Sequence, residues 1–133
     1  MKAVEIKKDI YWDGAKDWNL REFHGYNTPD GSTYNAYLIM DKDITLVDGV
    51  KHYMTEEQLN RISSVVDFNQ IKYVVVNHVE QDHSGSVPQI MKLAPQAEVV
   101  TNMAGKQALE AHYDTTGWNF KIIKTGDVIN IGN

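Results

Sequence analysis

The stretch Tyr73-Val-Val-Val-Asn-His-Val-Glu-Gln-Asp-His-Ser-Gly85 passes from a hydrophobic run directly into a group of metal-capable side chains. Its β-branched and aromatic start predicts a buried strand. If the chain stays extended beyond this run, the alternation of side chains places His78, Glu80 and Asp82 on one side. A turn soon afterwards would bring His83 to them. Because α/β sheets bind ligands at the carboxyl ends of their strands, we expect these four side chains to form a site.

The chemistry of these four side chains predicts a metal centre. Two imidazoles and two carboxylates are a harder ligand set than the thiolates or histidines of most zinc sites. Without a cation, Glu80 and Asp82 would resist joint ionisation at short range, and a metal removes this repulsion. The ligands divide into two pairs, His78 with Glu80 and Asp82 with His83, which indicates two adjacent metals. We expect iron, with manganese or zinc as alternatives. A solvated acidic turn is the simpler interpretation, and the spacing after a strand disfavours it.

The pattern His78-x-Glu80-x-Asp82-His83 resembles the H-x-E-x-D-H signature of flavodiiron proteins, which reduce dioxygen or nitric oxide. Hydrolases of the same metallo-β-lactamase fold carry a histidine where this chain has Glu80, so this residue separates the two groups. Three amino-terminal motifs are similar to the same family: Asp17-Trp18, Arg21-Glu-Phe-His-Gly-Tyr26 and Gly31-Ser-Thr-Tyr-Asn-Ala-Tyr-Leu38. The resemblance therefore extends over the whole chain.

This resemblance implies an α/β fold, namely the N-terminal half of a metallo-β-lactamase-like αββα sandwich over residues 1–133. In flavodiiron proteins two more histidines, a bridging aspartate and then a flavodoxin-like FMN domain follow the region that this chain covers. We therefore expect the second half of the metal domain and the FMN domain to be absent, and FMN not to be bound by this chain alone. The isolated chain is then expected to have little or no turnover.

The function that the resemblance implies is that of a diiron oxidoreductase, which reduces dioxygen to water, nitric oxide to nitrous oxide, or both. Electrons would arrive through FMN from a redox donor protein. The residues around His24 and Tyr26 indicate either an ordered loop over the site or a hydrophobic flap packed on the core. The resemblance favours the first, in which His24 and Tyr26 would donate a proton or a hydrogen bond to the bound oxygen species. Two alternatives remain open. One is a metal-dependent hydrolase with a metal-bound hydroxide nucleophile, which Glu80 disfavours. The other is a non-enzymatic diiron module that binds or senses oxygen.

The composition excludes several other functional classes. The chain has 133 residues, of which 42% are hydrophobic and 23% charged, as is usual for one globular domain. A net charge of −5 without a basic patch argues against a nucleic-acid partner. With no cysteine, the chain forms no disulfide and no thiolate-bound zinc or iron–sulfur site. The sequence shows no long apolar run and no signal-peptide core, so we expect no membrane partner and a cytoplasmic location.

Local patterns predict the remaining elements. Strands are expected over 3–6, 10–12, 33–40, 44–47, 73–76, 97–101, 120–123 and 128–131. Helices are expected from Thr55, with a capping box to Gln58, from Ser86, and over 103–113 with Asn102 as its cap. Asp48, just after a strand, is expected to cap a turn or anchor the neighbouring metal loop, or alternatively to orient a metal-binding histidine.

The last residues predict an exposed sheet edge. A strand over 128–131 would be followed by a hairpin turn at Gly132-Asn133 without a return strand. Because an unpaired edge can pair with another chain, we expect a homo-oligomer.

Overall fold

The computed structural model describes residues 1–132, so Asn133, and with it part of the turn expected at Gly132-Asn133, lies outside the described residues. The strands are β1 (Val4–Lys7), β2 (Ile10–Trp12), β3 (Ala15–Asp17), β4 (Glu22–Phe23), β5 (Tyr26–Asn27), β6 (Ser32–Tyr34), β7 (Tyr37–Ile39), β8 (Ile44–Val47), β9 (Ile71–Val75), β10 (Glu98–Thr101) and β11 (Asn119–Ile122). The helices are α1 (Thr55–Ser63), α2 (Gln81–Ser84), α3 (Val87–Leu93) and α4 (Met103–His112). Short 3₁₀ turns lie at His52–Met54 and Phe68–Gln70.

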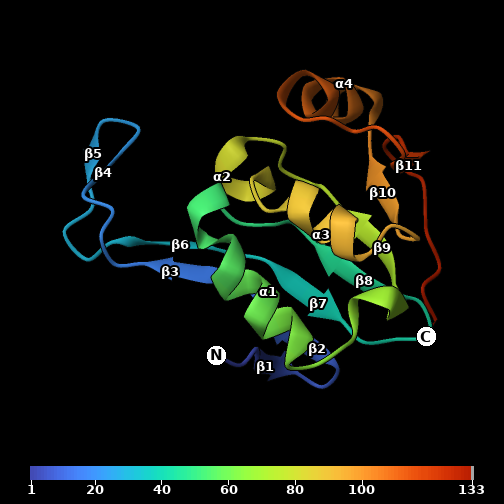
Figure 1. Ribbon diagram of the computed structural model, residues 1–133, viewed down its shortest axis with the longest axis horizontal. Helices are drawn as coiled ribbons and strands as arrows, with labels where there is room; N and C mark the ends of the chain where they lie inside the picture. The colour runs from blue at the N-terminus through green and yellow to red at the C-terminus, as the bar shows by residue number, and fades with distance from the viewer. Residues whose placement is uncertain (133) are drawn as a thin grey trace.

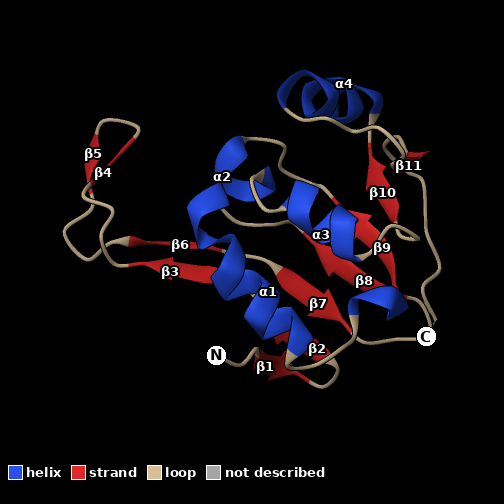
Figure 2. Cartoon of the chain, in the orientation of Figure 1, coloured by secondary structure: helices blue, strands red, loops and turns tan. Residues whose placement is uncertain are grey.

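Within residues 1–132, one seven-stranded sheet in the order β1-β2-β7-β8-β9-β10-β11 forms the centre of the molecule. Strands β1, β2, β7 and β8 pair antiparallel, whereas β8, β9, β10 and β11 run parallel. Helices α1 and α3 lie across one face of this sheet (Figures 1 and 2). Because β8, β9 and β10 are parallel, their carboxyl ends meet at one edge, and the loops that follow them lie together.

The hydrophobic core lies between this sheet and its helices. Leu46 of β8, Val74 of β9 and Val99 of β10 are fully buried and belong to one cluster with Ile62 of α1 and Ile90 of α3. Burial of each such side chain contributes about 1.5–3 kcal/mol. This packing fixes the three parallel strands, and with them the origin of each loop at the carboxyl edge.

The strand expected over 33–40 is in fact two strands in different sheets. β6 pairs with β3 in a separate two-stranded sheet, whereas β7 joins the large sheet between β2 and β8. Between them, the Asp13 N–H donates to the Ala36 carbonyl at 3.0 Å. The backbones approach closely here, because a Cβ on Gly14 would lie 2.0 Å from the Tyr34 carbonyl oxygen. The prediction of one continuous strand was wrong because this crossing is not encoded in the alternation of side chains.

The two predicted helix caps have different outcomes. α1 begins at Thr55 with Met54 at its N-cap and without a side-chain capping bond. The Thr55 hydroxyl donates instead to the His52 carbonyl at 2.6 Å, so the expected capping box is wrong. For α4 the prediction is confirmed, because Asn102 Oδ1 accepts from the Gly105 N–H at 2.7 Å.

The segment 128–131 is not a strand in the described part of the chain. A turn closed by the hydrogen bond from the Asp127 N–H to the Lys124 carbonyl precedes it, and Val128 is 91% exposed. The chain then runs back toward the start of β8, where the Asp43 N–H donates to the Ile131 carbonyl at 2.9 Å (Figure 1). The large sheet therefore ends at β11. None of the helices in residues 1–132 has the length and apolar character needed to cross a membrane.

Candidate metal centre

The candidate metal segment, His78 to His83, begins just after β9. Asp48 fixes the backbone at its start. The Asp48 N–H donates to the Val75 carbonyl at 2.8 Å. Its carboxylate Oδ1 accepts from the backbone N–H groups of Asn77 at 2.7 Å and His78 at 3.0 Å. Asp48 adopts a φ of +60°, a conformation in which aspartate is enriched among non-glycine residues. The structure thus confirms that Asp48 anchors the neighbouring loop.

The chain does not remain extended from His78 to His83, so the predicted alternation of side chains does not hold there. Glu80 is the last extended residue, and the one-turn helix α2 starts at Gln81. The N–H groups of His83 and Ser84 both donate to the Glu80 carbonyl, at 2.9 and 2.8 Å. Asp82 and His83 therefore both project from a helical turn and not from an extended chain.

The loop after β8 also holds the other end of the segment. The Gly49 N–H donates to the His83 carbonyl at 2.8 Å. Val50 and Ser86 exchange two hydrogen bonds, from Val50 N to Ser86 Oγ at 2.9 Å and from Ser86 N to the Val50 carbonyl at 3.0 Å. A Cβ on Gly49 would lie 2.4 Å from Ser86 Oγ, so the close approach of the two loops requires glycine there. Both ends of the metal segment are therefore fixed by one loop.

The four predicted ligands lie close together in two contacts. His78 Nε2 lies 3.5 Å from Glu80 Oε2, and His83 Nε2 lies 3.6 Å from Asp82 Oδ2. The two imidazole rings are perpendicular, with centroids 5.0 Å apart. His78, Asp82 and His83 can each offer one ligand atom within 4.8 Å of the others, whereas Glu80 stands beside His78 outside this compact group. These contacts match the two expected pairs, and metal binding by the four residues stays a prediction.

The donor set is suited to a metal ion. Nδ1 of His83 is buried and has no hydrogen-bond partner within residues 1–132. A buried polar atom without a partner is unfavourable, and a cation would satisfy it. The Asp82 side chain is only 13% exposed, whereas Glu80 and His78 face solvent. Imidazole and carboxylate donors together suit iron, manganese or zinc.

His24 and Tyr26 are not brought to this cluster. They occupy the hairpin formed by β4 and β5, which turns at His24 and Gly25, where φ is positive. The hairpin projects from the body of the molecule (Figure 1). Tyr26 is 76% exposed, and the ring contact of His24 is with Phe23, at 4.1 Å between centroids. No hydrogen bond or ring contact in the described chain joins either residue to the four candidate ligands, and their role as donors stays a prediction.

Three buried polar side chains, those of Asp13, Gln58 and Ser86, form a series of hydrogen bonds that was not predicted from the sequence. Gln58 Nε2 donates to Asp13 Oδ2 at 3.0 Å, and the Ser86 hydroxyl donates to Gln58 Oε1 at 2.6 Å. All three side chains are fully buried. Burial raises the pKa of Asp13 to about 7, although the hydrogen bond from Gln58 and the charge of Arg61 act in the opposite direction. The amphipathic pattern of α1 gave no sign that Gln58 faces inward.

Aromatic packing against His83 was also missed. The buried Tyr34 ring lies edge-on to His83, with centroids 6.4 Å apart at 85°. The sequence motif that contains Tyr34 indicated a family resemblance but not this contact. The contact depends on the pairing of β3 with β6, which the sequence did not predict.

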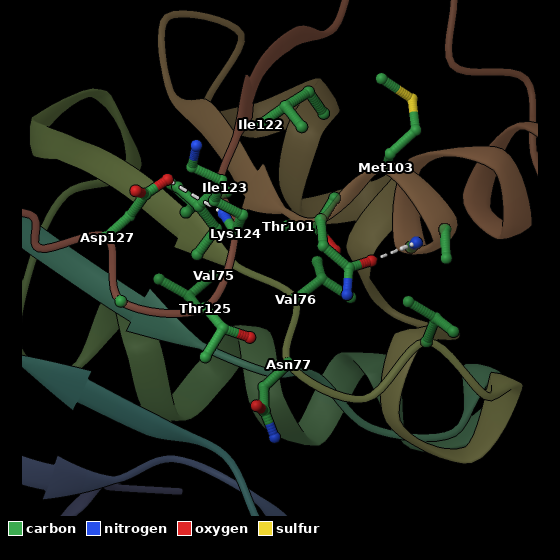
Figure 3. Close-up of a pocket in the computed structure, with 16 residues that line it drawn as sticks. Val75, Val76, Asn77, Thr101, Met103, Ile122, Ile123, Lys124, Thr125 and Asp127 are labelled. Carbon is green, nitrogen blue, oxygen red and sulfur yellow. Dashed lines mark hydrogen bonds between the residues drawn. The ribbon is translucent and has the colours of Figure 1, made fainter.

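An open pocket of about 1050 Å³ adjoins the metal segment at the carboxyl ends of β9, β10 and β11 (Figure 3). Asn77 and Val79, which flank His78, form part of its wall. Other parts of the wall come from the first turn of α4 and from the loop after β11, including Lys124 and Thr125. The metal segment therefore borders a largely apolar hollow as well as solvent.

Comparison with known proteins gives a consistent result. A family model described as ODP family beta lactamase matches residues 33–133. The chain is 44% identical to the nitric oxide reductase of Moorella thermoacetica, over 98% of this chain and 33% of that protein. The chain spans about a third of the length of the curated relatives that it matches.

Two solved structures share the fold. The flavodiiron protein from Giardia intestinalis superimposes with a TM-score of 0.94 at 35% identity, covering 99% of this chain and 32% of that one. The rubredoxin oxygen:oxidoreductase of Desulfovibrio gigas superimposes with a TM-score of 0.90 at 38% identity, covering 98% of this chain and 33% of that one. The expected metallo-β-lactamase-like α/β fold is confirmed by these similarities.

Proposed function

The chain belongs to the ODP beta-lactamase family and is similar to flavodiiron proteins over nearly its whole length, and on this premise we propose that it forms the metal-binding portion of a diiron oxidoreductase. The substrate class would be dioxygen, nitric oxide or both. These substrates are suggested by the names of two relatives, a nitric oxide reductase and an oxygen:oxidoreductase.

The observation that carries this proposal is the compact group of His78, Asp82 and His83, with Glu80 beside it. One metal would be held by His78 and Glu80, and the other by Asp82 and His83. Iron in this site would supply the redox chemistry. The protein contributes the rigid placement of these donors, because Asp48 and Gly49 hold the backbone at His78 and His83. Such backbone support keeps metal ligands in place before the ion arrives.

The other components of the reaction would come from outside these residues. Electrons would pass from a redox donor protein through FMN, which we do not expect this chain to bind by itself. We expect the isolated chain to have little turnover, to act in the cytoplasm and to form a homo-oligomer. The hydrolase alternative is disfavoured by Glu80, because the hydrolases of this fold carry histidine there.

The amount of iron bound per chain tests this proposal directly. The 133-residue chain would be loaded anaerobically with Fe(II), desalted and analysed for iron per chain, beside Asp82→Ala and the control Asp30→Ala, whose residue lies on the surface. We expect the wild type and the control to retain iron and Asp82→Ala to lose most of it. Equal iron content in all three proteins would remove Asp82 from the ligand set.

A further inference from the structure

Two motifs that the metal site does not use meet in a buried cluster. Asp17 ends β3 and Tyr34 ends β6, and both are buried, at 5% and 1% exposure. The Tyr34 hydroxyl donates to Asp17 Oδ2 at 3.0 Å. The hydroxyl of Tyr53, a half-exposed residue in the turn before α1, donates to the same oxygen and lies 3.2 Å from the Tyr34 hydroxyl. One carboxylate oxygen thus fixes two phenols.

This cluster is built to hold the Tyr34 ring rigidly. Burial acts to raise the pKa of Asp17, but hydrogen bonds from Tyr53, Tyr34 and the backbone outweigh it and lower the pKa below its ordinary value. Asp17 is therefore ionised at neutral pH and accepts from both phenols. Hydrogen bonds to a charged acceptor are stronger than those between neutral groups.

The Tyr34 ring reaches the metal site at His83. Its centroid lies 6.4 Å from that of His83, and the centroid of His78 lies 5.0 Å from His83, with both neighbours nearly perpendicular to its ring. His83 Nδ1 has no hydrogen-bond partner in the described chain, and Nε2 lies 3.6 Å from Asp82, beyond hydrogen-bond distance. Ring packing against Tyr34 and His78 therefore restrains the orientation of this imidazole before a metal binds, beside its contact with the Asp82 carboxylate.

We propose that Tyr34, held by Asp17 and Tyr53, is a positioning residue that sets the orientation of the His83 ring for metal binding. The inference rests on the proposed function in one respect, namely that His83 is a metal ligand. Groups that orient a metal-binding histidine typically change metal affinity by about 10- to 100-fold when they are removed. In this chain the orientation would come from an aromatic edge instead of a hydrogen bond.

The test compares Tyr34→Leu, which removes the ring, with Tyr34→Phe, which keeps the ring and removes its hydroxyl. Tyr37→Phe is the matched control, since it deletes a tyrosine hydroxyl from the same motif outside the cluster. Co(II) titration followed by visible absorption measures both affinity and coordination geometry. We expect about a 10-fold loss of Co(II) affinity and an altered spectrum in Tyr34→Leu, a smaller loss in Tyr34→Phe, and wild-type behaviour in the control.

A second readout needs no metal. The ring carbon and proton resonances of His83 in the metal-free protein should shift in Tyr34→Leu and also in Asp17→Asn, which keeps the Tyr34 ring but weakens its anchor. If Tyr34→Leu does not fold, Tyr34→Phe and Asp17→Asn decide the question. Unchanged Co(II) affinity and unchanged His83 resonances in the folded variants would overturn the positioning role.

The failure of this inference is distinct from that of the proposed function. If the wild type binds Co(II) and Asp82→Ala does not, but the Tyr34 variants match the wild type, only the positioning role is wrong. If the wild type itself binds no Co(II), the proposed function fails. The His83 resonances then show whether Tyr34 still orients the ring.

Discussion

Asp48 shows how one carboxylate can set the geometry of a site that lies about thirty residues further along the chain. It accepts from two consecutive N–H groups at the start of the metal segment, and its own positive φ turns the chain toward that segment. Asn77 and His78, whose N–H groups it binds, are exposed. Water would therefore partly replace the carboxylate as acceptor if Asp48 were removed. Its main effect should therefore be on the position of His78 and less on global stability.

The replacement Asp48→Ala should lower the free energy of unfolding by about 1 to 2 kcal/mol, because two net hydrogen bonds are lost. It should also lower the metal affinity by about 10-fold or more, because the His78 backbone is no longer fixed. Urea denaturation and Co(II) titration measure the two effects. Asp48→Asn keeps an acceptor oxygen and should behave more like the wild type. An Asp48→Ala protein with wild-type Co(II) affinity would show that this anchor does not set the geometry of metal binding.

Asp13 should make stability depend on pH. Its pKa is about 7 in the folded chain against about 3.8 when unfolded, because burial disfavours the charged carboxylate. Between these values the folded protein binds more protons than the unfolded one, so stability falls as the pH rises from about 4 to 7. The expected contribution is on the order of a few kcal/mol.

Replacing Asp13 with Asn should remove this dependence while keeping an acceptor for Gln58. Urea denaturation at several pH values between 4 and 8 measures it, with the surface substitution Asp30→Asn as the control. The wild type and Asp30→Asn should share the slope that Asp13→Asn lacks. The same slope in all three proteins would mean that another group carries it.

At the scale of elements, α4 begins at a residue whose side chain caps the helix, as the sequence predicted. Asn102 leaves β10 in an extended conformation and caps the first turn through Gly105. Loss of an N-cap side chain typically costs about 1 kcal/mol. By contrast, α1 has no side-chain cap. The hydroxyl of Thr55, in its first turn, donates a hydrogen bond to the His52 carbonyl.

Accordingly, Asn102→Ala should lower the free energy of unfolding by about 1 kcal/mol, and Asn102→Asp should be close to the wild type. Thermal and urea denaturation followed by circular dichroism measure this. An effect of Asn102→Asp as large as that of Asn102→Ala would contradict the capping role.

For the whole molecule, metal binding should increase the stability of the folded chain. A ligand that binds only the folded state stabilises it by about 2.7 kcal/mol at a concentration of 100 times its dissociation constant. The melting temperature of the wild-type chain should therefore rise with added Co(II) and fall again with a chelator. Asp82→Ala, which lacks one candidate ligand, should show little of this rise. A rise of equal size in both proteins would place the binding elsewhere.

Self-association is the second prediction at this scale. The strand over 128–131 on which this prediction was based is not formed in the described chain. The large sheet has β11 at this edge instead, and Ile122 on this strand is 39% exposed. A strand edge without a partner strand pairs readily with another chain, and a charge placed on it opposes pairing. Light scattering should show concentration-dependent association of the wild type and less of it in Ile122→Lys. A monomer at every concentration would contradict the expected homo-oligomer.

The sequence by itself determined the features that are local. The apolar run of β9 followed at once by His78, Glu80, Asp82 and His83 was enough to place candidate ligands at the carboxyl end of a strand. Asn102 likewise marked the start of α4. These predictions hold because side-chain chemistry and backbone conformation a few residues apart carry the whole signal.

Only the tertiary structure decided which distant residues meet at the site. Gln58 faces inward because Asp13 and Ser86 lie beside it, and Tyr34 reaches His83 because β6 leaves the large sheet to pair with β3. The same limit explains the wrong strand over 128–131, whose apolar residues alternate like a strand but find no neighbouring strand in the described chain. Pairing between segments far apart depends on the packing of the whole chain, and no local pattern contains that information.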